Sequence, residues 1–225
     1  MNSRKFMPAR TLIAAALLGV ILVLSGCSFF ARPVDTKYYT LDYIPSPKPE
    51  RLKKGPYPFS VRLRDPTMAE AYKRSQIVYR QSAYQMQFYA YHLWVVDPDR
   101  MIGDLLLKHL RTARLFENAS RSIEATRPDF QLTTDVQAIE EYDGPNTWYA
   151  HLAIEYQLLD DSTGQVVWKQ SYDLRKTVAQ QEPVFIVREL TALLESIHNQ
   201  LTDDLEKYLA GAQRRERPVV ETRPR

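Results

Sequence analysis

The sequence predicts an α+β fold: a single two-layer domain in which two helices pack on one face of a mostly antiparallel sheet. Strand-like segments are grouped, four before the first helical segment and three before the second, in the order ββββ-α-βββ-α. Grouped strands, as opposed to strands that alternate with helices, are typical of α+β proteins. The chain has 225 residues and no internal repeat, which suits one domain with short tails.

The first four strands are expected at residues 37–43, 59–64, 77–81 and 85–95, where β-branched and aromatic side chains are frequent. Five prolines stand in residues 44–58, between the first two of these strands. Because proline lacks an amide donor and fixes φ, we expect no regular structure in this segment.

Asp97 and Pro98 predict the start of the first helix. The Asp side chain can accept hydrogen bonds from unpaired amides, and proline in the first turn removes no donor that the helix needs. The apolar residues that follow lie on one helical face, and the helix is expected to end near Arg114. A second apolar face begins at Pro183 and continues in steps of three or four residues to Tyr208, which predicts a long helix along the sheet.

The last three strands are expected between these helices. Residues 130–138 and 148–158 alternate between apolar and polar side chains, which predicts strands with one buried face. A polar turn at 160–165 leads to the third strand, 166–174. Residues 210–225 are rich in arginine and are expected to form a disordered tail.

The N-terminal segment has the parts of a bacterial secretion signal. Met1–Arg10 is basic, and Thr11–Leu24 is an apolar run of 14 residues. As a helix this run would span roughly 21 Å, which is short of the ~30 Å hydrocarbon core of a bilayer. The run ends in Leu24, Ser25, Gly26 and Cys27, which resembles a lipobox. We therefore expect removal of residues 1–26 and lipidation of Cys27, with an uncleaved membrane anchor as the alternative.

The residues after Cys27 indicate where the protein goes. Ser28, where Asp would favour retention, resembles the pattern of lipoproteins exported to the outer membrane. Residues 27–36 would form a lipidated tether that reaches ~30 Å at full extension. The folded domain is expected at 37–209, facing the periplasm.

Composition excludes several functions. Removal of the leader, with its three cations, leaves 27 Lys and Arg against 27 Asp and Glu, so no positive field remains to hold nucleic acid. One cysteine forms neither an internal disulfide nor a Cys-rich metal site. The four histidines are scattered, and the chain has no HExxH, no GxSxG and no glycine-rich phosphate loop. We expect no enzyme activity, no metal, and no cofactor apart from the covalent lipid on Cys27.

The segment Tyr84–Trp94 is unusual because its side chains are apolar on both faces of the expected strand. A strand of this kind must be covered on both sides. The cover could be another part of this domain, or it could be a partner protein, since Tyr and Trp are enriched at interfaces.

Several segments, in this order and spacing, resemble the ABC-type transport auxiliary lipoproteins of the paraquat-inducible protein C type. The resemblance covers roughly residues 36–209 and ends with the long last helix; its segments are Tyr38-Tyr39-Thr40-Leu41, Arg74, Ile77-Val78-Tyr79-Arg80, Phe88–Trp94, Met101–Leu110, and Gly164 with Val166, Val167 and Trp168. The chain departs from the family pattern at Asp65-Pro66-Thr67-Met68, where a proline pair is common, and at Val95-Val96 after Trp94, where Ala and Pro are usual.

The resemblance implies an outer-membrane lipoprotein that docks an MCE-domain protein of the periplasm, in a conduit for phospholipid or another hydrophobic molecule. A ring around such a conduit would make a homo-oligomer natural. The alternative is a periplasmic lipoprotein cofactor of an envelope-assembly, secretion or peptidoglycan-synthesis machine. The candidate interface or signature residues, with core packing as the competing interpretation, are Tyr38, Tyr39, Tyr79, Arg80, Tyr89, Tyr91 and Trp94.

Overall fold

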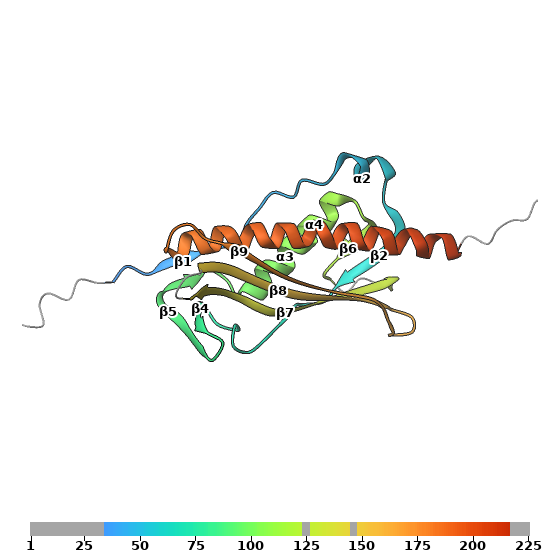
Figure 1. Cartoon of the computed structure of the whole chain (residues 1–225). Helices are drawn as coiled ribbons and strands as arrows, with labels where there is room; N and C mark the ends of the chain where they lie inside the picture. Colours follow the sequence, from blue (N-terminus) through green and yellow to red (C-terminus); the bar gives the residue numbers. More distant parts are fainter. Residues whose placement is uncertain (1–33, 123–126, 145–147, 217–225) are drawn as a thin grey trace, which may run out of the picture. The chain divides into compact units, whose positions relative to one another are not determined.

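The computed structural model describes residues 34–122, 127–144 and 148–216 (Figure 1). The chain divides into two units, and every described helix and strand belongs to the unit that begins at Thr36. The expected signal peptide, the lipobox with Cys27 and most of the expected tether lie outside the described residues.

A long antiparallel meander forms the body of the sheet. It consists of β7 (Phe130–Asp143), β8 (Trp148–Asp160) and β9 (Val166–Thr177). Pairing of β7 with β8 is continuous from Phe130 opposite Asp160 to Asp143 opposite Trp148, apart from one bulge. The predicted turn before β9 is confirmed, because the Asp160 carboxylate accepts the backbone amides of Ser162 and Thr163 at 2.9 Å.

Three short strands share the other edge of β7, and all of them run parallel to it. In order along β7 they are β2 (Tyr57–Leu63), β3 (Thr67–Met68) and β4 (Gln76–Ser82). Each strand covers only part of β7, so the sheet divides beyond this edge into two branches.

The two branches end differently. Beyond β2 lies β6 (Phe116–Ser120), which is parallel to it, and beyond β4 lies β5 (Gln85–Trp94), which is antiparallel to it. The branch that contains β4 and β5 ends in β1 (Lys37–Tyr39), which is parallel to β5. The predicted α+β class is confirmed. Most paired residues are in the antiparallel ladders, although five strand pairings are parallel.

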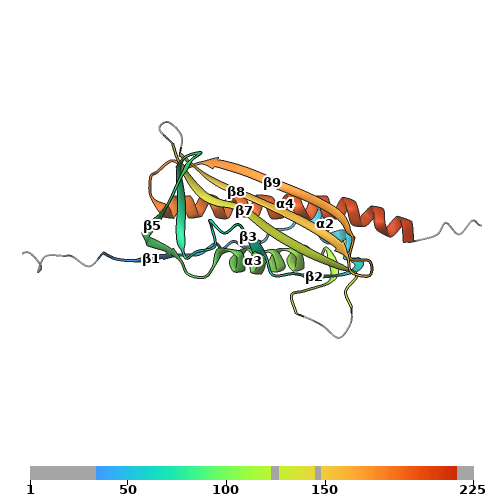
Figure 2. The ribbon, with the colours of Figure 1, turned by 90° about the horizontal axis from the view of Figure 1, so that it is seen from below.

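The two predicted helices, α3 (Pro98–Ala113) and α4 (Pro183–Glu216), pack on the same face of the sheet (Figures 1 and 2). Helix α3 ends as expected, with Arg114 in the left-handed conformation at φ 51°. Helix α4 lies along β8 and β9 and buries most of its apolar face, including Leu190, Leu194, Ile197, Leu201 and Leu205.

A third helix, α2 (Pro49–Lys54), occupies part of the proline-rich segment where no regular structure was expected. That prediction was wrong because Pro49 stands in the first turn, where its missing amide costs nothing. Ion pairs hold α2 against α4: Arg51 and Lys54 contact Glu206 at 3.1 and 2.7 Å. The Arg51 side chain is itself buried in this contact between α2 and α4.

Other boundaries also differ from the prediction. Strands β3 and β6 were not expected, since each is too short to show a pattern of its own. Strand β1 ends at Tyr39, because the chain then leaves the sheet and buries Leu41 and Tyr43 in the core. Helix α4 continues to Glu216, so residues 210–216 of the expected disordered tail are helical, and the rest of that tail lies outside the described residues.

Two histidines lie buried between the helices and the sheet. The Tyr43 hydroxyl contacts Nδ1 of His109 on α3 at 3.1 Å and Nδ1 of His198 on α4 at 2.5 Å. Nε2 of His198 contacts the Tyr156 hydroxyl on β8 at 3.1 Å. Burial lowers the pKa of His109 to about 4 and the pKa of His198 well below its usual value. Both rings are therefore neutral in the folded protein near neutral pH.

Acid should destabilise the domain through these rings. The unfolded chain binds a proton at His109 below its ordinary pKa of 6.5, whereas the folded domain binds it only near pH 4. Between about pH 7 and about pH 5 the free energy of unfolding should fall by roughly 2 kcal/mol from His109 alone. Urea denaturation across this range measures the slope. The variant His109→Leu should show a shallower slope, and an unchanged slope would contradict this account.

Candidate partner interface

A bulge in β7 decides which side chains lie at the β4–β5 end of the sheet. Val136 pairs with Ile154 and Ala138 with Ala153, so Gln137 is one residue more than β8 provides. Side chains of a strand alternate between faces, and the extra residue therefore exchanges the faces of everything that follows it. Glu141 points to the helix side of the sheet as a result, and Glu140 points to the opposite side.

Glu140 is the centre of a buried polar cluster on the sheet face opposite the helices. Its carboxylate accepts the Tyr72 hydroxyl at 2.7 Å and Nε of Arg80 at 3.1 Å. Nδ1 of His151 lies 3.1 Å away, and Nε2 of the same ring contacts Asp173 at 2.9 Å. Burial alone would raise the pKa of Glu140, but these hydrogen bonds and the charge of Arg80 hold it below its usual value. The cluster fastens β4 and the turn before it onto the meander.

Glu141, on the helix side, has a different environment. It accepts the Tyr89 hydroxyl at 2.9 Å and the indole N–H of Trp148, and it has no cation partner among the described residues. Burial outweighs these hydrogen bonds and raises the pKa of Glu141. Tyr89 is on β5, so Glu141 holds this strand as Glu140 holds β4.

Four rings form a continuous row on the helix side of β4, β5 and β1. Tyr79 and Tyr89 have ring centroids 4.8 Å apart, Tyr89 and His92 are 5.2 Å apart, and His92 and Tyr39 are 5.6 Å apart. The Tyr39 hydroxyl contacts Nδ1 of His92 at 2.7 Å, and the Tyr79 hydroxyl donates to Gln87 at 2.5 Å. The three tyrosine hydroxyls of the row are already paired, and the rings support the end of the sheet.

All seven candidate residues lie at the β4–β5 end of the sheet, but they differ in burial and in contacts. Trp94 is 5% exposed and packs in the core, which is the competing interpretation given for it above. Arg80 lies in an ion pair with the buried Glu140. Tyr39, Tyr79 and Tyr89 belong to the partly buried ring row. Only Tyr38 and Tyr91 are broadly exposed, at 63% and 46%.

The β4–β5 hairpin carries further exposed aromatic residues. Tyr84 is wholly exposed in the turn between β4 and β5, and Phe88 is 52% exposed with the Arg74 guanidinium 4.8 Å from its ring centroid. We call Tyr84, Phe88 and Tyr91 with Arg74 the β5 surface. Tyr84 and Phe88 were part of the segment that is apolar on both faces, but alternation alone did not show which of its members would stay exposed.

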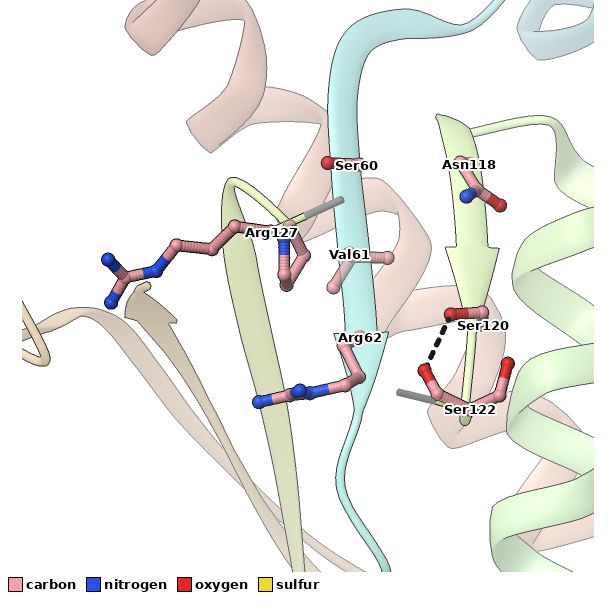
Figure 3. A pocket seen from close by; sticks show the side chains of 8 residues that line it. Ser60, Val61, Arg62, Asn118, Ser120, Ser122 and Arg127 are labelled. Atoms are coloured by element: carbon pink, nitrogen blue, oxygen red, sulfur yellow. Dashed lines mark hydrogen bonds between the residues drawn. The ribbon is translucent and has the colours of Figure 1, made fainter. Parts of the chain in front are cut away.

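A separate hollow lies between β2 and β6 (Figure 3). Figure 3 shows Ser60 and Arg62 on β2, Ser120 on β6, and Arg127 extending away from β2 on the side opposite β6. Both guanidinium groups contact the Asp161 carboxylate, and the Ser60 hydroxyl donates to Asp129 at 2.7 Å. The described lining consists of serine, asparagine and arginine side chains with Val61 and Pro128.

Across residues 34–122, 127–144 and 148–216, no group of three or more His, Cys, Asp or Glu side chains is arranged to hold a metal ion. In the same residues no helix combines the length and the apolar character needed to cross a bilayer. The features that stand out are exposed aromatic side chains on the β4–β5 hairpin, with the partly buried Arg74 over the ring of Phe88.

Comparison with known families defines this domain further. The family model of the ABC-type transport auxiliary lipoprotein component matches residues 39–202, which is most of the chain. The protein therefore belongs to the ABC-type transport auxiliary lipoprotein family, and the predicted resemblance is confirmed. The family name associates it with an ABC transport system. No curated protein sequence matches the chain.

Two solved structures share the fold. A DUF330 family protein from Xanthomonas campestris is 17% identical, with a TM-score of 0.66 over 80% of this chain and 99% of its own. An uncharacterized protein is 13% identical, with a TM-score of 0.60 over 76% of this chain and 99% of its own. At these identities the similarity shows the fold alone.

Removing the arginine of the polar cluster should weaken the fold. Arg80→Ala leaves the buried Glu140 carboxylate with Tyr72 and His151 only, and we expect the free energy of unfolding to fall by about 2–3 kcal/mol. As a matched control, Arg175→Ala removes an arginine whose exposed guanidinium lies 3.8 Å from Asp173. This control should change stability by less than about 0.5 kcal/mol. Equal losses in urea denaturation would contradict the role given to Glu140.

Proposed function

We propose that this protein is an outer-membrane lipoprotein that docks an MCE-domain protein in a system for moving lipid, or another hydrophobic molecule, between membranes. Membership of the transport auxiliary lipoprotein family is the observation that carries this proposal. The lipobox that ends at Cys27 supports attachment to a membrane, and Ser28 after it favours the outer membrane. On this proposal the lipid on Cys27 holds one end of a conduit across the periplasm.

The β5 surface is the proposed docking site. Tyr and Arg side chains contribute a large share of the binding energy in protein interfaces. On this surface Tyr84, Tyr91 and Phe88 are exposed, and the partly buried Arg74 lies over the Phe88 ring. The carboxylates of Glu140 and Glu141 fasten β4 and β5 beneath it, so a partner would not need to order the hairpin on binding.

The proposed role is mechanical and non-enzymatic. An auxiliary component of an ABC system leaves ATP hydrolysis to another subunit, and this chain has no glycine-rich phosphate loop. We propose that this protein positions the MCE protein, because it is attached to the membrane and presents a rigid surface to that partner. Copies of the chain arranged around the conduit would present several such surfaces at once.

Copurification tests this proposal. The full-length protein is recovered from gently solubilised, crosslinked membranes, and its partners are identified by mass spectrometry. We expect an MCE-domain protein, and we expect Cys27→Ala to lose both the membrane fraction and most of this partner. Recovery of a secretion component, an envelope-assembly factor or a peptidoglycan synthase in its place would contradict the proposal and support a cofactor of that machine.

Substitutions on the β5 surface locate the contact. The double variant Phe88→Ser and Tyr91→Ser should reduce recovery of the MCE protein by about tenfold or more, since each lost anchor costs on the order of 1–2 kcal/mol. The control Val166→Ser and Val167→Ser changes two exposed apolar residues at the start of β9 and should leave recovery unchanged. Both variants should keep the membrane fraction of the wild type. Equal effects of the two variants would exclude the β5 surface as the docking site.

A further inference from the structure

A second surface lies where the chain enters the domain. A groove runs between β1 and the start of α4, which lie at the same end of the sheet (Figures 1 and 2). Its lining comes from three elements: β1, β5 and the first residues of α4 with Glu182 before them. The lining residues are Lys37, Tyr38, Tyr39, His92, Glu182, Pro183 and Val184.

We propose that this groove binds the zwitterionic phospholipid headgroups of the membrane that holds the lipid anchor, so that the domain docks on the bilayer by its β1 end. This inference rests on the proposed lipidation of Cys27. It adds a contact with a lipid surface that is separate from the β5 surface proposed for the protein partner.

The groove presents one positive and one negative charge. Neither the Lys37 ammonium nor the Glu182 carboxylate forms an ion pair with any described residue. Their fields nevertheless reach the groove: after the effect of burial, Lys37 lowers the pKa of His92 and Glu182 raises the pKa of Tyr39. A phosphate would be favoured beside Lys37 and an ammonium beside Glu182, which are the two charges of a phosphatidylethanolamine headgroup.

The polar floor and apolar rim of the groove fit the same ligand. The Tyr39 hydroxyl and His92 are already bonded to each other at 2.7 Å, so the floor is satisfied without a ligand. Tyr38 and Val184 stand at the rim and are 63% and 49% exposed. A tyrosine combines an apolar ring with a polar hydroxyl and is enriched where hydrocarbon meets headgroups. Contact with a bilayer surface would remove the apolar parts of these two side chains from water, which is favourable.

The length of the chain before β1 brings the bilayer within reach. With Cys27 in the membrane, residues 28–36 allow at most ~30 Å between the lipid and Lys37. The β1 end of the domain can therefore reach the headgroups. Since the lining holds one cation and one anion, the groove matches a zwitterionic surface better than an anionic one, which would call for a basic cluster.

The chain offers a direct way to test this docking. Cys27 is its only cysteine, so in the lipidated protein the variant Val184→Cys carries the only free thiol. A polarity-sensitive fluorophore on this thiol is followed in full-length protein that is purified from the membrane fraction and reconstituted in vesicles of phosphatidylethanolamine and phosphatidylcholine. We expect blue-shifted emission that is quenched by nitroxide-labelled headgroups. The same label at Val167→Cys, in the partly exposed start of β9, should report water.

Two tyrosine substitutions identify the surface that touches the lipid. In the labelled Val184→Cys protein, Tyr38→Ser should shift the ratio of docked to undocked domain by about tenfold toward undocked. Tyr84→Ser is the matched control: this tyrosine is wholly exposed but lies roughly 25 Å along β5 from His92. Lys37→Glu should also weaken docking, and addition of phosphatidylglycerol to the vesicles should not strengthen it.

The outcomes separate this inference from the proposed function. Equal quenching at positions 184 and 167, in protein that floats with the vesicles, would overturn the docking and leave the lipid anchor intact. Protein that does not float would overturn the proposed lipidation and this inference with it. Protection at position 184 that rises with the density of protein in the vesicle would identify a second copy of the chain as the occupant. Loss of docking in Tyr84→Ser but not in Tyr38→Ser would also overturn the proposal.

Discussion

The bulge at Gln137 is the constraint on which this end of the molecule depends. Without it, regular alternation would place Glu140 on the core side of β7 and Glu141 on the other side. The extra residue gives each carboxylate its own set of donors: Tyr72, Arg80 and His151 for Glu140, and Tyr89 and Trp148 for Glu141. One inserted residue thereby ties β4 and β5 to the meander from both faces of the sheet.

The buried carboxylates contribute more to specifying one arrangement of the β4–β5 hairpin than to the free energy of unfolding. A buried carboxylate is costly unless its donors are in place, so alternative registers of β4 against β7 would leave Glu140 without its partners. An exposed aromatic surface benefits from such a foundation, because a partner then meets side chains already held in position. The same reasoning explains why the candidate residues divide as they do. Arg80 and Tyr89 hold the hairpin, while Tyr91 and Phe88 are presented by it.

Much of the fold could be predicted from patterns that are local in sequence. The apolar faces of α3 and α4 and the alternation in β7 and β8 come from burial on one side, which repeats over many residues. Strand β3 has two residues and is defined only by its pairing with β7. A segment this short shows no local sequence pattern from which it could be predicted. The end of β7 was placed too early, since the bulge interrupts the alternation at Gln137. At the candidate interface, residue types suggested which side chains to consider, but their exposure depends on neighbours distant in the chain, as the buried Trp94 illustrates.

The way in which β7 is paired has a consequence for how the chain folds. Val61 of β2 meets Phe130, and Tyr79 of β4 meets Glu141, so each of these contacts closes a loop of some sixty residues or more. Sheets dominated by contacts of high sequence separation fold slowly, because loop-closure entropy is lost before the pairing is gained. The central strand acquires its neighbours on this edge only after it has itself been synthesised. The β7–β8–β9 meander, whose strands follow one another in the chain, can form first and then offer its free edge to β2, β3 and β4.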